Sequence, residues 1–134
     1  PEARLTVLGH TRWASVGIIS EPNCHPLNSE ESEMTGADQS RPYVVAALNG
    51  DVDNHGDLRI EHGLRIPTPI TTDAKVIPTL MSRHLADGVA PVEAFRRTVS
   101  AFEGSIAARL AAGTIPCVRV IGQGTAAVAG LDLL

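Results

Sequence analysis

The sequence predicts an α+β domain over residues 1–134. Apolar residues at helical spacing and short apolar runs of strand type both occur, but they do not alternate as regular βαβ units. Hydrophobic residues make up 43% of the chain and charged residues 19%, which excludes a disordered chain. Because there is only one Trp, one Tyr and two Phe, the core must consist mainly of aliphatic side chains.

The first third of the chain is predicted to contain one clear strand. Residues 43–48 form an apolar run that ends at the turn signal Asn49-Gly50. Residues 15–28 are expected to be irregular because two prolines interrupt them. The polar stretch 28–42 is expected to be an exposed, mobile loop.

Three helices are predicted in the middle of the chain. The first covers residues 53–61 and is closed by Gly63. The second covers 73–85, where Pro78 favours a late start or a kink. Pro91 suits the first turn of the third helix. The apolar face of that helix is predicted to consist of Val92, Phe95, Val99 and Phe102.

The remaining segments are predicted to be extended. Two prolines favour an extended backbone over residues 66–70. Strands are expected at 105–110, 117–121 and 125–131, and the glycine-rich residues 122–124 are expected to form a turn.

The charge and the cysteine content exclude several classes of partner. The net charge of −4 lacks the basic surplus of nucleic-acid-binding proteins. No apolar run reaches transmembrane length, so no membrane partner is expected. Cys24 and Cys117 do not form a disulfide framework, and reduced thiols favour a cytoplasmic location. Cys24 precedes His25, but sequence neighbours usually point apart, so a buried or loop thiol is favoured over a nucleophile–base pair.

No metal or cofactor is predicted. Asp51-x-Asp53-x-His55 resembles the beginning of a calcium loop. Such a loop requires Asp or Asn at its fifth position and Glu at its twelfth, where this sequence has His55 and His62. The five histidines and two cysteines also lack the close spacing of zinc ligands.

Three places have side chains that are able to carry chemistry. Arg12 offers a planar fork for a carboxylate, or alternatively stacks on Trp13. The side chain of Asn49 and the backbone N–H of Gly50 can form an oxyanion hole, or alternatively a plain hairpin turn. Asp73 lies at the start of a predicted helix, where its carboxylate can bind an amine. Alternatively, Asp73 or Thr72 is an ordinary N-cap of that helix.

The order of these places is typical of one family. Four motifs follow one another: GHTRWAS at 9–15, EPNCHP at 21–26, LNGDVDN at 48–54 and TDAKVI at 72–77. Together they resemble the glutaminase domain of the class II, N-terminal-nucleophile, glutamine amidotransferases. The most similar branch is that of the glutamine–fructose-6-phosphate aminotransferases, and the resemblance extends from residue 5 to about residue 110.

The resemblance implies a fold and an activity. The fold would be a four-layer αββα sandwich of antiparallel sheets, here a single partial glutaminase domain that is incomplete at its N-terminus and lacks the sugar-phosphate isomerase domain. The full protein would hydrolyse glutamine and deliver ammonia to a sugar phosphate, namely fructose 6-phosphate, to make glucosamine 6-phosphate. It would need no cofactor and would form a homo-oligomer in the cytoplasm.

The resemblance also implies roles for six residues. Arg12 would hold the α-carboxylate of glutamine and Asp73 its α-ammonium group. Asn49 and Gly50 would stabilise the oxyanion of the tetrahedral intermediate. The two remaining residues are Trp13, in a mobile loop over the glutamine, and Ser15, whose hydroxyl would lie near the substrate.

The sequence departs from the family pattern in the nucleophile. The family uses a cysteine at the mature N-terminus, with its own α-amino group as the base. This sequence begins with Pro1, so the 134 residues alone are not expected to carry out the reaction. The alternative is a non-catalytic glutaminase-like domain that binds an amino acid or a partner domain. Further departures are Val16, Leu48, Ala74 and Pro78.

Overall fold

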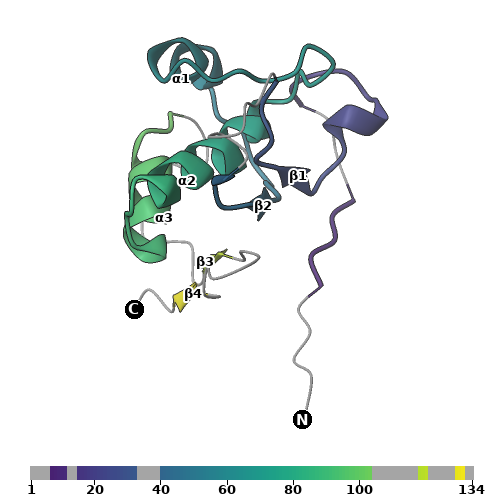
Figure 1. The fold of residues 1–134 in the computed structure, drawn as a ribbon. Coiled ribbons are helices and arrows are strands. Elements are labelled where there is room, and N and C mark those ends of the chain that lie inside the picture. The colour runs from purple at the N-terminus through teal and green to yellow at the C-terminus, as the bar shows by residue number, and fades with distance from the viewer. Residues whose placement is uncertain (1–6, 12–14, 33–39, 104–117, 121–128, 132–134) are drawn as a thin grey trace.

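A computed structural model describes residues 7–11, 15–32, 40–103, 118–120 and 129–131. In chain order the described elements are the 3₁₀ turn η1 (Glu21–Asn23), strands β1 (Leu27–Asn28) and β2 (Val45–Ala46), helix α1 (His55–Glu61), the 3₁₀ turn η3 (Asp73–Lys75), helices α2 (Val76–Ala86) and α3 (Pro91–Ser100), and strands β3 (Val118–Val120) and β4 (Ala129–Leu131). The order mixes helices and strands without regular alternation, as the sequence predicts (Figure 1).

The described strands form two antiparallel pairs. Strand β1 pairs with β2, with Leu27 opposite Ala46. Strand β3 pairs with β4, with Arg119 opposite Gly130. The four-layer sandwich stays a prediction, and the predicted strand at 105–110 and turn at 122–124 lie outside the described residues.

The strand predictions for the first third of the chain are only partly right. Of the predicted strand 43–48, Val45–Ala46 form β2 and pair with β1, and Val44 makes an isolated bridge. Residues 15–28 were expected to be irregular, but they contain η1 and β1. Pro22 does not prevent η1, because a proline in the first turn of a helix loses no intrahelical hydrogen bond.

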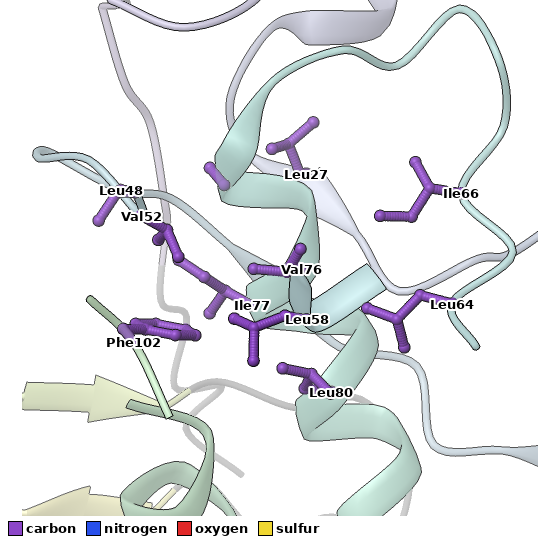
Figure 2. Packing of buried hydrophobic residues seen from close by; sticks show 11 residues of the cluster. Leu27, Leu48, Val52, Leu58, Leu64, Ile66, Val76, Ile77, Leu80 and Phe102 are labelled. Carbon is purple, nitrogen blue, oxygen red and sulfur yellow. The ribbon is translucent and has the colours of Figure 1, made fainter. Parts of the chain in front are cut away.

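Helix α2 is the element around which the others pack. It contacts α1, α3, β1 and β2 (Figure 1). Its side chains Val76, Ile77 and Leu80 belong to an aliphatic core (Figure 2), which contains Leu27, Leu48, Val52, Leu58, Leu64, Ile66, Ala74, Val76, Ile77, Leu80 and Phe102. Phe102 is the only aromatic member, in agreement with the composition. Met81 of the same helix belongs to a second cluster, with Val44 and Ala94.

The late start predicted for the second helix is confirmed. The 3₁₀ turn Asp73–Lys75 comes first, and α2 begins at Val76. Pro78 is thus the third residue of α2, within the first turn, where backbone N–H groups have no intrahelical acceptor. The proline therefore costs no hydrogen bond of the helix.

The predicted apolar face of the third helix is wrong at two positions. Phe102 is buried but lies after α3, which ends at Ser100. Pro91 begins α3 as expected, but Val92 is 41% exposed. The fully buried residues are Ala94 and Thr98, and the Thr98 hydroxyl donates to the Ala94 carbonyl over 2.9 Å. Because this bond satisfies the hydroxyl, a threonine can occupy a buried position.

The segment expected to be a polar loop contains a buried ion-pair network. Ser29 and Glu31 are buried, so the prediction of an exposed loop is wrong at these two residues, although Glu30 between them is exposed. Both Glu31 oxygens bind the guanidinium group of Arg83, at 2.8 and 2.5 Å, and Arg41 contacts one of them at 3.0 Å. The backbone N–H of Arg65 also donates to Glu31, over 2.7 Å. These donors compensate for the removal of the carboxylate from water.

A buried lysine connects η3 to β1. Lys75 is inaccessible to solvent, and its Nζ donates to the carbonyl and the side-chain oxygen of Asn28 over 2.7 and 2.9 Å. Burial lowers the pKa of Lys75 to about 8, although the negative charges of Glu30 and Glu31 act to raise it. The ammonium group thereby fixes the residues that follow Asp73 against the first strand.

We predict that the Glu31 carboxylate stabilises the fold at neutral pH and loses this effect in acid. Burial alone would raise its pKa, but the hydrogen bonds from Arg83 and Arg65 and the charges of Arg83 and Arg41 lower the pKa below 4.5. Glu31→Gln is expected to reduce the free energy of unfolding at pH 7 by about 1.5–3 kcal/mol. Since the folded-state pKa is the lower one, the difference from wild type should shrink as the pH falls from 4.5 through that lowered value.

Denaturant unfolding at several pH values measures this effect. Glu93→Gln is the matched control, because Glu93 forms exposed ion pairs with Arg96 and Arg97 on α3. It should change stability less than Glu31→Gln does. Equal effects of the two variants would contradict the prediction.

Candidate functional site

One pocket brings together segments that are far apart in the sequence. Its volume is about 480 Å³, and among the described residues it is lined by Gly9–Thr11, Ser15–Val16, His25, Leu48–Asp51 and Thr72–Asp73. Four predicted site residues, Ser15, Asn49, Gly50 and Asp73, therefore meet at one place. Arg12 and Trp13 lie outside the described residues, but the described residues on either side of them line the pocket.

Asp73 is buried and held by two hydrogen bonds. The backbone N–H of Val52 donates to its Oδ2 over 2.7 Å, and the Thr72 hydroxyl donates to its Oδ1 over 3.3 Å. Thr72 stands at the N-cap of η3, but its side chain makes no capping hydrogen bond, so the alternative of an ordinary cap at Thr72 is wrong. A carboxylate has about four acceptor positions, so these two bonds leave capacity for a further donor in the pocket.

Asn49 and Gly50 lie between two buried anchors. Leu48 and Val52 are buried members of the aliphatic core (Figure 2). The Leu48 N–H donates to Nδ1 of His25 over 3.1 Å, and the Val52 N–H donates to Asp73. The peptide between them is therefore held at both ends, and Asn49 is exposed at the pocket.

The hairpin alternative for Asn49-Gly50 is wrong. After Gly50 the chain enters helix α1 at His55, rather than a strand that pairs with β2. Gly50 has a φ of 151°, a conformation that side chains with a Cβ rarely adopt. The glycine thus allows a backbone course at the pocket that most other residues would resist.

Ser15 contacts the same segment. Its hydroxyl donates to the Asp51 carboxylate, and both residues line the pocket. The resemblance implies that this hydroxyl lies near a substrate, which stays a prediction. Its observed bond, however, connects the loop that contains Ser15 to the residue after Gly50.

The loop after Ser15 is pressed closely against Thr71 and Thr72. Gly17 has a φ of +83°, and a Cβ there would lie 2.8 Å from the Thr72 nitrogen. The Ile18 N–H also donates to the Thr71 hydroxyl over 3.1 Å. A glycine is required at residue 17 both by the conformation and by this close approach.

Asn23 fixes the residues that lead into Asp73. Its side chain is fully buried, and its Oδ1 accepts the N–H groups of Thr71 and Thr72 over 2.7 and 2.9 Å. Its Nδ2 donates to Ser20 Oγ over 2.8 Å and to the Pro69 carbonyl over 3.3 Å. One amide group thereby connects η1 to the segment 69–72.

Sequence patterns alone assign no role to Asn23, nor to His25 in holding the Asn49-Gly50 segment. The available signal was the motif at 21–26, in which both residues occur. Cys24, between them, is exposed and its thiol donates to the Ser20 carbonyl over 3.4 Å. The preference for a loop thiol is confirmed, because Nδ1 of His25 bonds to the Leu48 N–H; Cys117 lies outside the described residues.

The described residues contain neither a cluster of metal ligands nor a helix that could cross a membrane. Within them, no group of three or more His, Cys, Asp or Glu side chains is arranged to hold a metal ion. None of the helices in the described ranges has the length and apolar character needed to span a bilayer.

Curated glutamine–fructose-6-phosphate aminotransferases match most of this chain. The protein from Geobacillus kaustophilus is 32% identical over 108 residues, which cover 80% of this chain and 16% of that protein. The protein from Halobacterium salinarum is 33% identical over 109 residues, covering 78% and 16%. The chain is a homologue of part of these aminotransferases.

The match covers only a small part of each relative. The aminotransferase from Mesorhizobium japonicum is 33% identical over 103 residues, 75% of this chain and 15% of that protein. The chain thus spans about one sixth of the length of the curated aminotransferases. No family model matches the chain. No solved structure matches it either.

We predict that removal of the Asn23 amide loosens the pocket wall. Asn23→Ala leaves two backbone N–H groups, those of Thr71 and Thr72, without their side-chain acceptor. The free energy of unfolding should fall by about 1–3 kcal/mol, which urea unfolding of the purified protein measures. Cys24→Ala, at the next position, is exposed and should change stability by less than about 0.5 kcal/mol. An unchanged midpoint for Asn23→Ala would contradict this role of the amide.

Proposed function

We propose that this chain is a glutamine-hydrolysing domain of an amidotransferase that delivers ammonia to a sugar phosphate. The acceptor would be fructose 6-phosphate and the product glucosamine 6-phosphate. The similarity to the curated aminotransferases supports the family, and the pocket supports the glutaminase role. A cytoplasmic location and a homo-oligomeric full-length protein are parts of the same proposal.

The observation that carries the proposal is the meeting of Asp73 with Asn49-Gly50 in one pocket. Glutamine has an α-ammonium group at one end and a reactive carboxamide at the other. The Asp73 carboxylate offers unused acceptor capacity for the ammonium group. Arg12, close in sequence to the pocket residue Thr11, would take the α-carboxylate, and Trp13 would cover the bound substrate.

Asn49 and Gly50 would act on the carboxamide. Attack on this group moves negative charge onto its oxygen, and fixed N–H donors stabilise that charge. Asn49 makes no hydrogen bond with any other residue in the described part of the chain, so its Nδ2 is available as a donor. The two anchors at Leu48 and Val52 hold these donors in place before the reaction, which is the condition for such stabilisation.

The nucleophile would be a cysteine at the mature N-terminus of the full-length protein. Its thiolate would attack the carboxamide carbon, ammonia would leave, and water would hydrolyse the glutamyl thioester. Cys24 is not this nucleophile, because the lining residues of the described part of the pocket do not include it. The intact mass and N-terminal sequence of the native protein test this assignment. A mature protein without an N-terminal cysteine and without glutaminase activity would favour the alternative, a non-catalytic domain that binds an amino acid or a partner domain.

We predict that Asp73→Asn weakens glutamine binding. The variant keeps an oxygen that accepts the Val52 N–H, but it loses the charge that attracts the ammonium group. The KM for glutamine hydrolysis by the full-length protein should rise by about 10- to 100-fold. Thr72→Val, which removes only the hydroxyl donor to Asp73, is the control and should change KM much less. A KM unchanged in Asp73→Asn would remove this role.

Asn49→Ala is expected to give the opposite kinetic pattern. Because an oxyanion donor acts mainly in the transition state, kcat should fall by about 100- to 1000-fold while the KM for glutamine stays nearly constant. Steady-state kinetics with glutamine as the only substrate separate the two parameters. A rise in KM at constant kcat would place Asn49 in ground-state binding instead.

A further inference from the structure

We propose that the stacked pair of His10 and His25 positions the Asn49-Gly50 segment for catalysis. His25 would act as a positioning residue, through the backbone of Leu48, and His10 would fix the ring of His25. This inference rests on the proposed glutaminase function, but its structural part can be tested without activity.

His25 holds the residue that precedes Asn49. Its Nδ1 accepts the Leu48 N–H over 3.1 Å. A backbone N–H only donates, so Nδ1 carries no proton in this bond and the neutral ring has its proton on Nε2. The bond joins two segments that are 23 residues apart, namely the loop after η1 and the end of the β2 region.

His10 holds the ring of His25 by stacking. The two ring centroids are 4.7 Å apart and the planes are inclined by 29°. Both histidines line the pocket. Nδ1 of His10 is buried and has no hydrogen-bond partner, so the recorded contact of this ring is the stack and not a polar bond. A ring held in this way limits rotation of its neighbour and directs Nδ1 of His25 at Leu48.

The hydrogen bond of the Leu48 N–H lies where it can control the placement of Asn49 and Gly50. Asn49 and Gly50 follow immediately, and the next fixed N–H is that of Val52 on Asp73. Release of the Leu48 bond would leave that end of the segment held by the buried Leu48 side chain alone, without a fixed backbone N–H. A displacement of the Asn49 and Gly50 donors by a fraction of an ångström weakens oxyanion stabilisation, whereas binding of the glutamine α-groups depends on other atoms.

Kinetics of the full-length protein test the pair by a split between kcat and KM. His25→Ala should lower kcat for glutamine hydrolysis by about 10- to 100-fold, less than loss of a donor itself, with KM within about threefold of wild type. His25→Asn should restore most of kcat, because its side-chain oxygen can lie where Nδ1 does. His10→Ala should lower kcat, and His10→Phe should retain it, because phenylalanine keeps the stacking surface.

Hydrogen exchange provides a measurement that needs no activity. In wild type, the peptide that contains Leu48 should exchange slowly. His25→Ala and His10→Ala should exchange faster there, while peptides of α2 and α3 stay as protected as in wild type. Loss of protection throughout the chain would show that the alanine variants unfold. The kinetics and exchange of His25→Asn and His10→Phe would then test the positioning role.

The outcomes separate this inference from the proposed function. A wild-type protein without glutaminase activity refutes the proposed function, while exchange at Leu48 still tests the positioning. An active protein in which His25→Ala has the kcat of wild type overturns the inference. So does a His25→Asn variant as slow as His25→Ala, a His10→Phe variant as slow as His10→Ala, or unchanged exchange at Leu48.

Discussion

Buried backbone N–H groups must find acceptors, and this requirement decides the form of the pocket. The segments 48–52 and 71–72 lie outside regular helices and strands, so their N–H groups cannot be satisfied by a ladder of backbone bonds. Polar side chains act as acceptors instead. Asn23 accepts two N–H groups at Thr71 and Thr72, His25 accepts the one at Leu48, and Asp73 accepts the one at Val52. The hydrophobic core fixes α2, and these bonds fix the loops relative to it.

The helices could be predicted well from the sequence because their signals are local. Pro78 predicted the late start of α2, and Pro91 marked the start of α3. Two predictions failed where partners are distant in the sequence. Glu31 was expected on a polar loop, but Arg83 from α2 makes its burial favourable. Val92 was expected to be buried, but smaller side chains of α3 occupy the buried positions.

In the candidate site, too, residues within known motifs could be predicted, whereas residues that act through distant partners could not. The resemblance to known motifs predicts roles for Asn49, Gly50 and Asp73, and the fold brings these residues to one pocket. Their catalytic and binding roles stay predictions. The supporting residues could not be found from spacing. Asn23 bonds to backbone atoms nearly fifty residues away, and the partners of such bonds depend on how the chain folds rather than on a sequence pattern. Arg12 and Trp13 lie outside the described residues, so their roles stay predictions.

The bond between Asp73 and Val52 restricts how this pocket can evolve. A change of preferred ligand, for example to a molecule without an α-ammonium group, would relax the need for a negative charge at residue 73. It would not relax the need for an oxygen there, because the Val52 N–H would otherwise lose its acceptor in a buried position. The set of tolerated residues at this position is therefore narrow for reasons that have nothing to do with the ligand. An invariant Asp or Asn among homologues would not by itself prove that they bind the same molecule.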